Sequence, residues 1–159
     1  MKHALNLVAI ALLVAVAVLP SQAQTNPLVG TWKLNVAKSK YNPGPAPKSL
    51  TRTIEPQGDG VKYTFDGVAA DGSAISYGFA VQFDGKDYPG TGSMPNGADS
   101  VTAKRTDANH YVFTQKKGDK VVGTSKVTVS EDGTSTTVDA QGTNAAGAKT
   151  HDIQVYDKQ

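Results

Sequence analysis

The chain has 159 residues, with 16 basic and 14 acidic side chains and a net charge of +2, which suits one globular domain. Charges of both signs are interspersed, so the basic patch that neutralises phosphate groups is absent and nucleic acid is excluded as a partner. The sequence has no cysteine, which excludes disulfides, thiolate nucleophiles and thiolate metal sites.

Residues 1–23 have the pattern of an export signal. A short basic start precedes an apolar run over residues 4–19, and the small residue Ala23 lies where a signal peptidase would cut. A retained membrane anchor is the weaker alternative, because a membrane-spanning helix needs roughly 20 apolar residues. We therefore expect cleavage after Ala23 and export to a bacterial periplasm or the medium. The mature domain would cover residues 24–159 without stable membrane insertion.

The first expected strand covers residues 28–34 and contains Trp32, the single tryptophan of the chain. Apolar and polar residues alternate around it with the period of a half-buried strand. A proline-rich connection follows, and proline lacks the amide donor that a helix needs, so no helix can cover residues 41–47. One turn of helix fits before it, at residues 37–41.

Further segments with strand periodicity follow at short intervals, separated by turn residues such as Asp71-Gly72 and Asp84-Gly85. We expect these strands over residues 49–55, 61–68, 73–83, 86–88, 100–106, 110–117, 120–130, 134–141 and 149–156. Residues 89–99 are rich in glycine and proline, which predicts a mobile loop there.

The succession of hairpins predicts an all-β fold. Strands joined by hairpins form an antiparallel up-and-down sheet, and a sheet of about 8–10 strands in one small domain usually closes into a barrel to remove its edges. A β-sandwich is the alternative architecture. It would need longer crossover connections than this sequence offers.

Two terminal motifs resemble those of the calycin superfamily. They are Gly30-Thr31-Trp32-Lys33-Leu34 near the mature start and Val155-Tyr156-Asp157-Lys158 at the end. The nearest branches are the lipocalin-like and fatty-acid-binding-like barrels. The sequence also resembles a group of exported bacterial lipocalin-like proteins, through its opening motif and through Asp84-Gly85-Lys86-Asp87-Tyr88-Pro89. The resemblance implies a ligand-binding barrel and no reaction.

The chain departs from the fatty-acid-binding branch at two positions that matter for the ligand. That branch caps its barrel with a helix pair between the first two strands, where this chain has its prolines. The branch also grips a carboxylate with the arginine of a terminal Arg-x-Tyr motif, and Gln154 stands at that place here. A second inward cation of the branch would fall near Lys126. A fatty acid is therefore a poor candidate ligand.

The candidate ligand-binding residues are the aromatic side chains of consecutive strands and a few polar groups. The resemblance makes Trp32 the residue that closes the narrow end. The other aromatic candidates, which either fill the interior or line an apolar pocket, are Tyr63, Phe65, Tyr77, Phe79, Tyr111 and Phe113. The polar candidates are Lys126, Gln154 and Tyr156, with Arg105 as a further cation. Lys126 and Arg105 alternate with apolar neighbours, and this pattern favours the solvent face for both of them.

One conflict concerns the last strand. Ile153 and Val155 occupy the opposite face from Gln154 and Tyr156, so only one pair can point inward. Burial of apolar surface favours the first pair, and the family pattern favours the second. The sequence alone leaves this open.

The sequence favours ligand binding over catalysis. Only His110 and His151 remain after processing, they lie on separate strands, and neither is part of a catalytic triad or a metal-ligand set. We therefore expect no enzyme activity, no metal and no cofactor, with haem on a histidine as a remote possibility. The leading hypothesis is an exported, monomeric barrel that binds a small, largely apolar molecule non-covalently. The alternative is a filled barrel that acts as an envelope or secreted protein-interaction module, with Tyr41, Tyr88 and Met94 exposed on its loops.

Overall fold

The computed structural model describes residues 26–159, so the predicted signal over residues 1–23 lies outside the described part. Ten β-strands and two short 3₁₀ helices make up the fold. In chain order they are β1 (Gly30–Leu34), η1 (Val36–Lys38), β2 (Ser49–Gln57), β3 (Gly60–Val68), β4 (Ala74–Val81), β5 (Asp84–Gly92), η2 (Pro95–Gly97), β6 (Ser100–Arg105), β7 (His110–Lys117), β8 (Lys120–Val129), β9 (Ser135–Thr143) and β10 (Lys149–Lys158).

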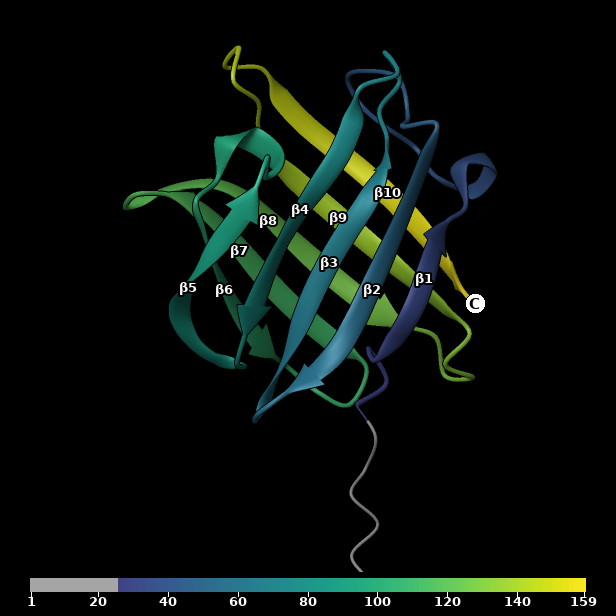
Figure 1. Ribbon diagram of the computed structural model, residues 1–159, viewed down its shortest axis with the longest axis vertical. Helices are drawn as coiled ribbons and strands as arrows, with labels where there is room; N and C mark the ends of the chain where they lie inside the picture. Colours follow the sequence, from purple (N-terminus) through teal and green to yellow (C-terminus); the bar gives the residue numbers. More distant parts are fainter. Residues whose placement is uncertain (1–25) are drawn as a thin grey trace, which may run out of the picture.

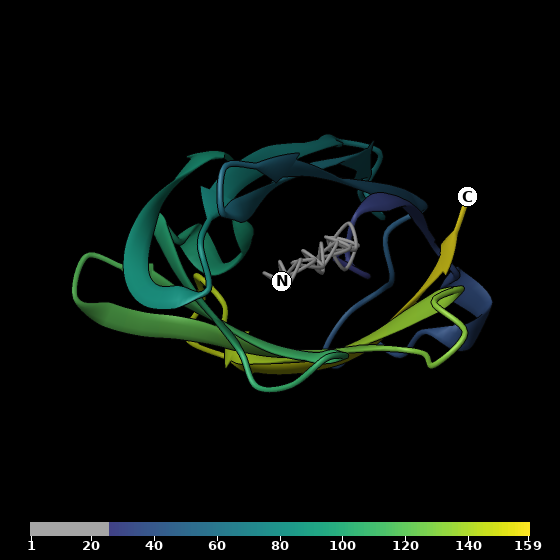
Figure 2. The same ribbon diagram turned by 90° about the horizontal axis from the view of Figure 1, so that it is seen from below.

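The strands form one closed antiparallel barrel in hairpin order (Figures 1 and 2). Each strand pairs with its neighbours in the sequence, and β1 closes the ring against β10 through the pairs Trp32↔Lys158 and Leu34↔Tyr156. The predicted all-β up-and-down barrel is thereby confirmed, and the sandwich is excluded. The closed barrel of ten strands agrees with the barrel architecture that was expected from the terminal motifs.

The largest departure from the predicted strands is β5. The sequence predicted a short strand at residues 86–88 and a loop after it, but β5 continues through Pro89 to Gly92. The amide of Gly90 donates to Asp99 O on the β6 side, so the nitrogen of Pro89 faces β4. The β4–β5 ladder begins only at Phe79↔Gly90, so no hydrogen bond is lost at the proline.

The connection between β1 and β2 contains η1 and no longer helix. The side chain of Asn35 accepts a hydrogen bond from the amide of Lys38 at 3.1 Å, which caps this single turn. The prolines after it keep residues 41–47 free of helix, as predicted. No helix in the part of the chain from residue 26 onward is long and apolar enough to cross a membrane.

One end of the barrel is filled with large side chains, and we call it the packed end. It contains the fully buried side chains of Leu28, Trp32, Ile54, Val61, Tyr111 and Val129. The indole Nε1 of Trp32 donates a 2.8 Å hydrogen bond to Leu28 O, so the buried ring leaves no polar atom unpaired. The opposite end, toward η2, is not filled.

Candidate functional site

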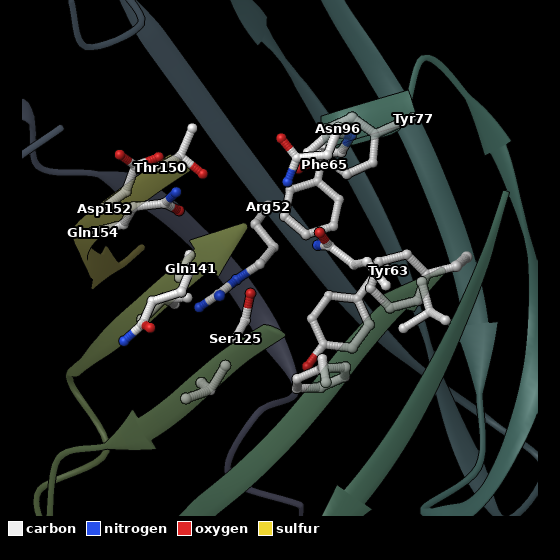
Figure 3. Close-up of a pocket in the computed structure, with 18 of the residues that line it drawn as sticks. Arg52, Tyr63, Phe65, Tyr77, Asn96, Ser125, Gln141, Thr150, Asp152 and Gln154 are labelled. Atoms are coloured by element: carbon white, nitrogen blue, oxygen red, sulfur yellow. The ribbon is translucent and has the colours of Figure 1, made fainter. Parts of the chain in front are cut away.

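A cavity of about 150 Å³ occupies the barrel interior between the packed end and η2, and we call this part the hollow end. Figure 3 shows the polar side chains Gln141, Thr150, Asp152 and Gln154 on one side of it and aromatic rings on the other, with Arg52 between them. The cavity therefore has an aromatic wall and a polar wall.

The aromatic wall comes from β3, β4 and β7. Tyr63 pairs with Phe79 and Phe65 with Tyr77 across the β3–β4 ladder, which places all four rings on the inner face. The ring centroids of Tyr63 and Phe79 are 4.9 Å apart and those of Phe65 and Tyr77 are 4.4 Å apart, both stacked. Phe113 meets Tyr63 edge-on with its centroid 5.5 Å away. Mutual stacking fixes these rings in place, and the ring faces that point toward the cavity form an apolar surface.

The polar wall comes mainly from β8, β9 and β10. Its polar side chains are those of Ser125, Gln141, Thr150, Asp152 and Gln154. The β10 register resolves the conflict that the sequence left open, because Gln154 lines the cavity and Tyr156 is 1% exposed. Ile153 and Val155 lie on the outer face and are half-buried where η1 packs beside β10. The Tyr156 hydroxyl donates a 2.9 Å hydrogen bond to Gln154 Oε1.

Arg52 lies where the two walls meet the packed end, and it was missed by the sequence analysis. It is 3% exposed and lines the cavity from β2. The signal was present in the sequence, because Arg52 shares a strand face with the apolar Leu50 and Ile54. A charged side chain is almost never fully buried unless it is paired, so an inward-facing arginine on a barrel strand indicates a specific role.

Aromatic rings hold the Arg52 side chain in place. Its guanidinium carbon lies 4.3 Å from the ring centroid of Tyr156 and 5.7 Å from that of Trp32, both within cation–π range. Nη2 donates a hydrogen bond to the buried hydroxyl of Thr136 on β9. Since β2 and β9 are not neighbours in the sheet, this bond crosses the interior.

Two buried donor atoms of residues that line the cavity have no partner among residues 26–159. They are Nε of Arg52 and the hydroxyl of Tyr63. Burial raises the pKa of Tyr63, with Arg52 opposing the rise, and burial raises the pKa of Tyr156 to about 12. Both tyrosines are therefore neutral hydrogen-bond donors at physiological pH.

Asp152 is the acidic residue that lines the cavity. Its Oδ1 accepts a 3.0 Å hydrogen bond from the amide of Asn42, and it makes no ion pair with Arg52. Burial raises the pKa of this carboxyl, partly offset by the Asn42 hydrogen bond. Within the described chain, Arg52 therefore has no carboxylate counter-ion.

The segment around η2 covers the cavity at the hollow end. Pro95 and Asn96 line the cavity, and Met94 is 6% exposed beside them. Asn96 has a positive φ of 58°, a conformation that asparagine tolerates, and its Nδ2 donates to Val122 O at 3.3 Å. Gly142 makes room for it, since a Cβ there would lie 2.5 Å from Asn96 Nδ2. Side-chain contacts thus hold this cover against β8 and β9.

The structure brings together most of the candidate residues predicted from the sequence. Those that line the cavity are Tyr63, Phe65, Tyr77, Phe79, Phe113, Gln154 and Tyr156. Trp32 and Tyr111 are buried in the packed end instead. Lys126 lies opposite Asp139 in the β8–β9 ladder and is exposed on the outer face of β8, as the alternation of its strand favoured, so it does not line the cavity as the family resemblance implied. Arg105 is also exposed and donates to the carbonyls of Asp107 and Ala108.

The two histidines of the described chain lie on the outer surface, away from the barrel cavity. His110 bonds Asp107 and His151 bonds Asp139, both on the exposed surface. From residue 26 onward, no group of three or more His, Asp or Glu side chains is arranged to hold a metal ion. Met94 is buried and Tyr41 and Tyr88 are half-buried, so these three residues do not form the exposed cluster that an interaction module requires.

No protein-family model and no curated protein matches the sequence. Among solved structures, the zebrafish ileal bile-acid-binding protein complexed with cholic acid is similar, with 11% identity, 84% of this chain and 99% of that chain covered, and a TM-score of 0.48. A redesigned β-barrel bound to DFHBI has 13% identity, with coverages of 83% and 95% and a TM-score of 0.47. Lobster apocrustacyanin A1 has 12% identity, coverages of 86% and 63%, and a TM-score of 0.43.

Proposed function

We propose that this protein is an exported barrel that binds a small, largely apolar molecule non-covalently in its hollow end, without a reaction. The observation that carries the proposal is the cavity of about 150 Å³ between an aromatic wall and a polar wall. A space of this size accommodates a single six-membered ring. Rings that are already stacked lose little entropy when a ligand arrives, which favours binding.

The polar wall gives the ligand an orientation. An apolar ring gains most by lying against Phe65, Tyr77 and Phe79, where it removes apolar surface from water. A polar substituent on that ring would then face Gln154 and Ser125, which offer donors and acceptors.

The test is calorimetric titration of the mature protein with phenylacetamide, a neutral molecule with one ring. We expect saturable binding that Ser125→Phe abolishes, because the new ring fills the cavity. Thr128→Phe is the matched control, since Thr128 lies on the outer face of the same strand. Absence of binding to the native barrel, or equal binding by Ser125→Phe, would contradict the proposal.

Export is part of the proposal and has its own test. Expression of the full chain in a bacterium should yield a periplasmic or secreted product that begins at Gln24, identified by N-terminal sequencing. A cell-associated product that still carries residues 1–23 would contradict it.

A further inference from the structure

Resting on the proposed function, we propose that the preferred ligand is a small monocarboxylate with one ring, whose carboxylate contacts Arg52 and whose ring lies on the aromatic wall. The cation of this site is Arg52 on β2. It differs in position from the arginine of the terminal Arg-x-Tyr motif, whose place is taken here by Gln154.

Within residues 26–159, Arg52 carries a buried positive charge without a counter-charge. Arg52 is 3% exposed and makes no ion pair with a described residue, although the cost of burying a charge is normally offset by a partner of opposite sign. Its contacts are the Tyr156 and Trp32 rings and the Thr136 hydroxyl, all of which are uncharged. A carboxylate in the cavity would supply the missing opposite charge.

Arg52 and Tyr63 also have unused hydrogen-bonding capacity. Arg52 Nε and the Tyr63 hydroxyl are both buried without an acceptor, and both residues line the cavity. An unmade hydrogen bond of a buried donor is costly, so both donors favour a ligand that brings acceptors. A carboxylate has two oxygens and accepts at each of them, whereas a single hydroxyl or carbonyl oxygen satisfies the pair less well.

The size of the cavity limits what can accompany the carboxylate. A cavity of about 150 Å³ holds one ring and a short linker, so a long acyl chain does not fit without displacing the cover at η2. The stacked rings of Phe65 and Tyr77 present flat faces, which suit a planar ring. A single unpaired cation matches a single negative charge.

Asp152 sets the direction in which the ligand lies. Its carboxyl belongs to the polar wall on β10 and is held by the Asn42 amide, so it repels a second carboxylate there. The ligand carboxylate therefore lies toward Arg52 and the packed end. The ring fills the space between Arg52 and the cover formed by Pro95 and Asn96.

The experiment compares phenylacetate with phenylacetamide, which has nearly the same shape and no charge. In the native barrel at pH 7 we expect phenylacetate to bind about tenfold or more tightly, because only its carboxylate brings a negative charge to the buried guanidinium. Arg52→Gln should lower the affinity for phenylacetate more than the affinity for phenylacetamide, so that the ratio of the two affinities falls to about one. Arg52→Lys should keep part of the preference, since the charge remains and the planar fork is lost.

Lys126→Gln is the matched control, because it removes one positive charge from the outer face of the barrel. It should leave the preference unchanged. Equal affinities of the native barrel for the two ligands would overturn the inference and leave the proposed function intact. A full preference in Arg52→Gln, or its loss in Lys126→Gln, would overturn the inference as well. Failure of both ligands to bind would overturn the proposed function together with it.

If Arg52→Gln does not fold, the comparison in the native barrel still decides the matter, and a pH titration adds a readout that a purely structural arginine would not move. The preference should disappear as the pH falls through the pKa of the ligand carboxyl, because the protonated acid has no charge for Arg52 to bind. A preference that persists for the protonated acid would contradict the role given to Arg52.

Discussion

The packed end and the hollow end of the barrel are built from the same ten strands and the same inward alternation, yet one is solid and the other contains a cavity. In the packed end, large apolar side chains meet across the barrel axis, and the indole nitrogen of Trp32 donates its hydrogen bond to Leu28 O. In the hollow end, aromatic rings on β3 and β4 face smaller, polar side chains on β8 to β10. The size and polarity of facing residues decide whether a barrel interior is filled, and the backbone does not.

The largest expected effect is a difference between the two ends in how much a truncated side chain lowers the free energy of unfolding. Trp32→Ala should lower the free energy of unfolding by about 3–5 kcal/mol, because it opens a void in a packed region. Phe65→Ala should cost less, because the ring it removes already borders empty space. Urea denaturation of both variants measures the difference. Equal losses would mean that the hollow end is packed as tightly as the other.

Arg52 at the boundary should behave as a ligand-binding residue more than a stabilising one. We expect Arg52→Met to change the free energy of unfolding by no more than about 1 kcal/mol without ligand. Removal of a buried, unpaired charge offsets the lost cation–π contacts and the Thr136 hydrogen bond. Thermal and urea unfolding check this. A loss as large as that of Trp32→Ala would assign Arg52 to the packed end.

The cover of the hollow end provides a smaller effect. Asn96→Gly keeps the positive φ and removes the hydrogen bond to Val122 O, so stability should change by less than about 1 kcal/mol. The exchange of phenylacetamide should become faster, because the side chain that holds η2 against β8 is gone. Stopped-flow or NMR line-shape measurements report the rate. An unchanged rate would show that ligands enter elsewhere.

The smallest effect concerns pH. Since burial raises the pKa of Asp152, the folded protein binds this proton more tightly than the unfolded chain does. The contribution of Asp152 to stability is therefore greatest below the ordinary aspartate pKa and falls as the pH rises through the raised value. Asp152→Asn should raise Tm slightly at pH 7. It should also flatten the dependence of Tm on pH between the ordinary aspartate pKa and the raised value. A lower Tm at pH 7 would mean that the carboxylate is stabilised by a contact that the asparagine loses.

The sequence was sufficient for the barrel and for the aromatic wall, because alternation along residues 61–68 and 73–83 assigns Tyr63, Phe65, Tyr77 and Phe79 to one face. The alternation along residues 120–130 also favoured the solvent face for Lys126, where the structure has it. The sequence was insufficient for the last strand, because β10 pairs with β1 at the other end of the chain and no local pattern shows that Gln154 and Tyr156 face inward. Arg52 was visible as a charge between Leu50 and Ile54. Its burial depends on Thr136, Tyr156 and Trp32, which no local pattern connects to it.

The most direct test of the account is the NMR signal of the Arg52 Nε–H group during a titration with phenylacetate. The described chain contains two arginines, and Arg105 serves as an internal reference because its Nε already donates to Asp107 O at 2.8 Å. We predict a saturable downfield shift of the Arg52 proton, as its unpartnered donor gains an acceptor, with Arg105 unmoved. An unmoved Arg52 signal under saturating phenylacetate would contradict the claim that this cavity binds a carboxylate.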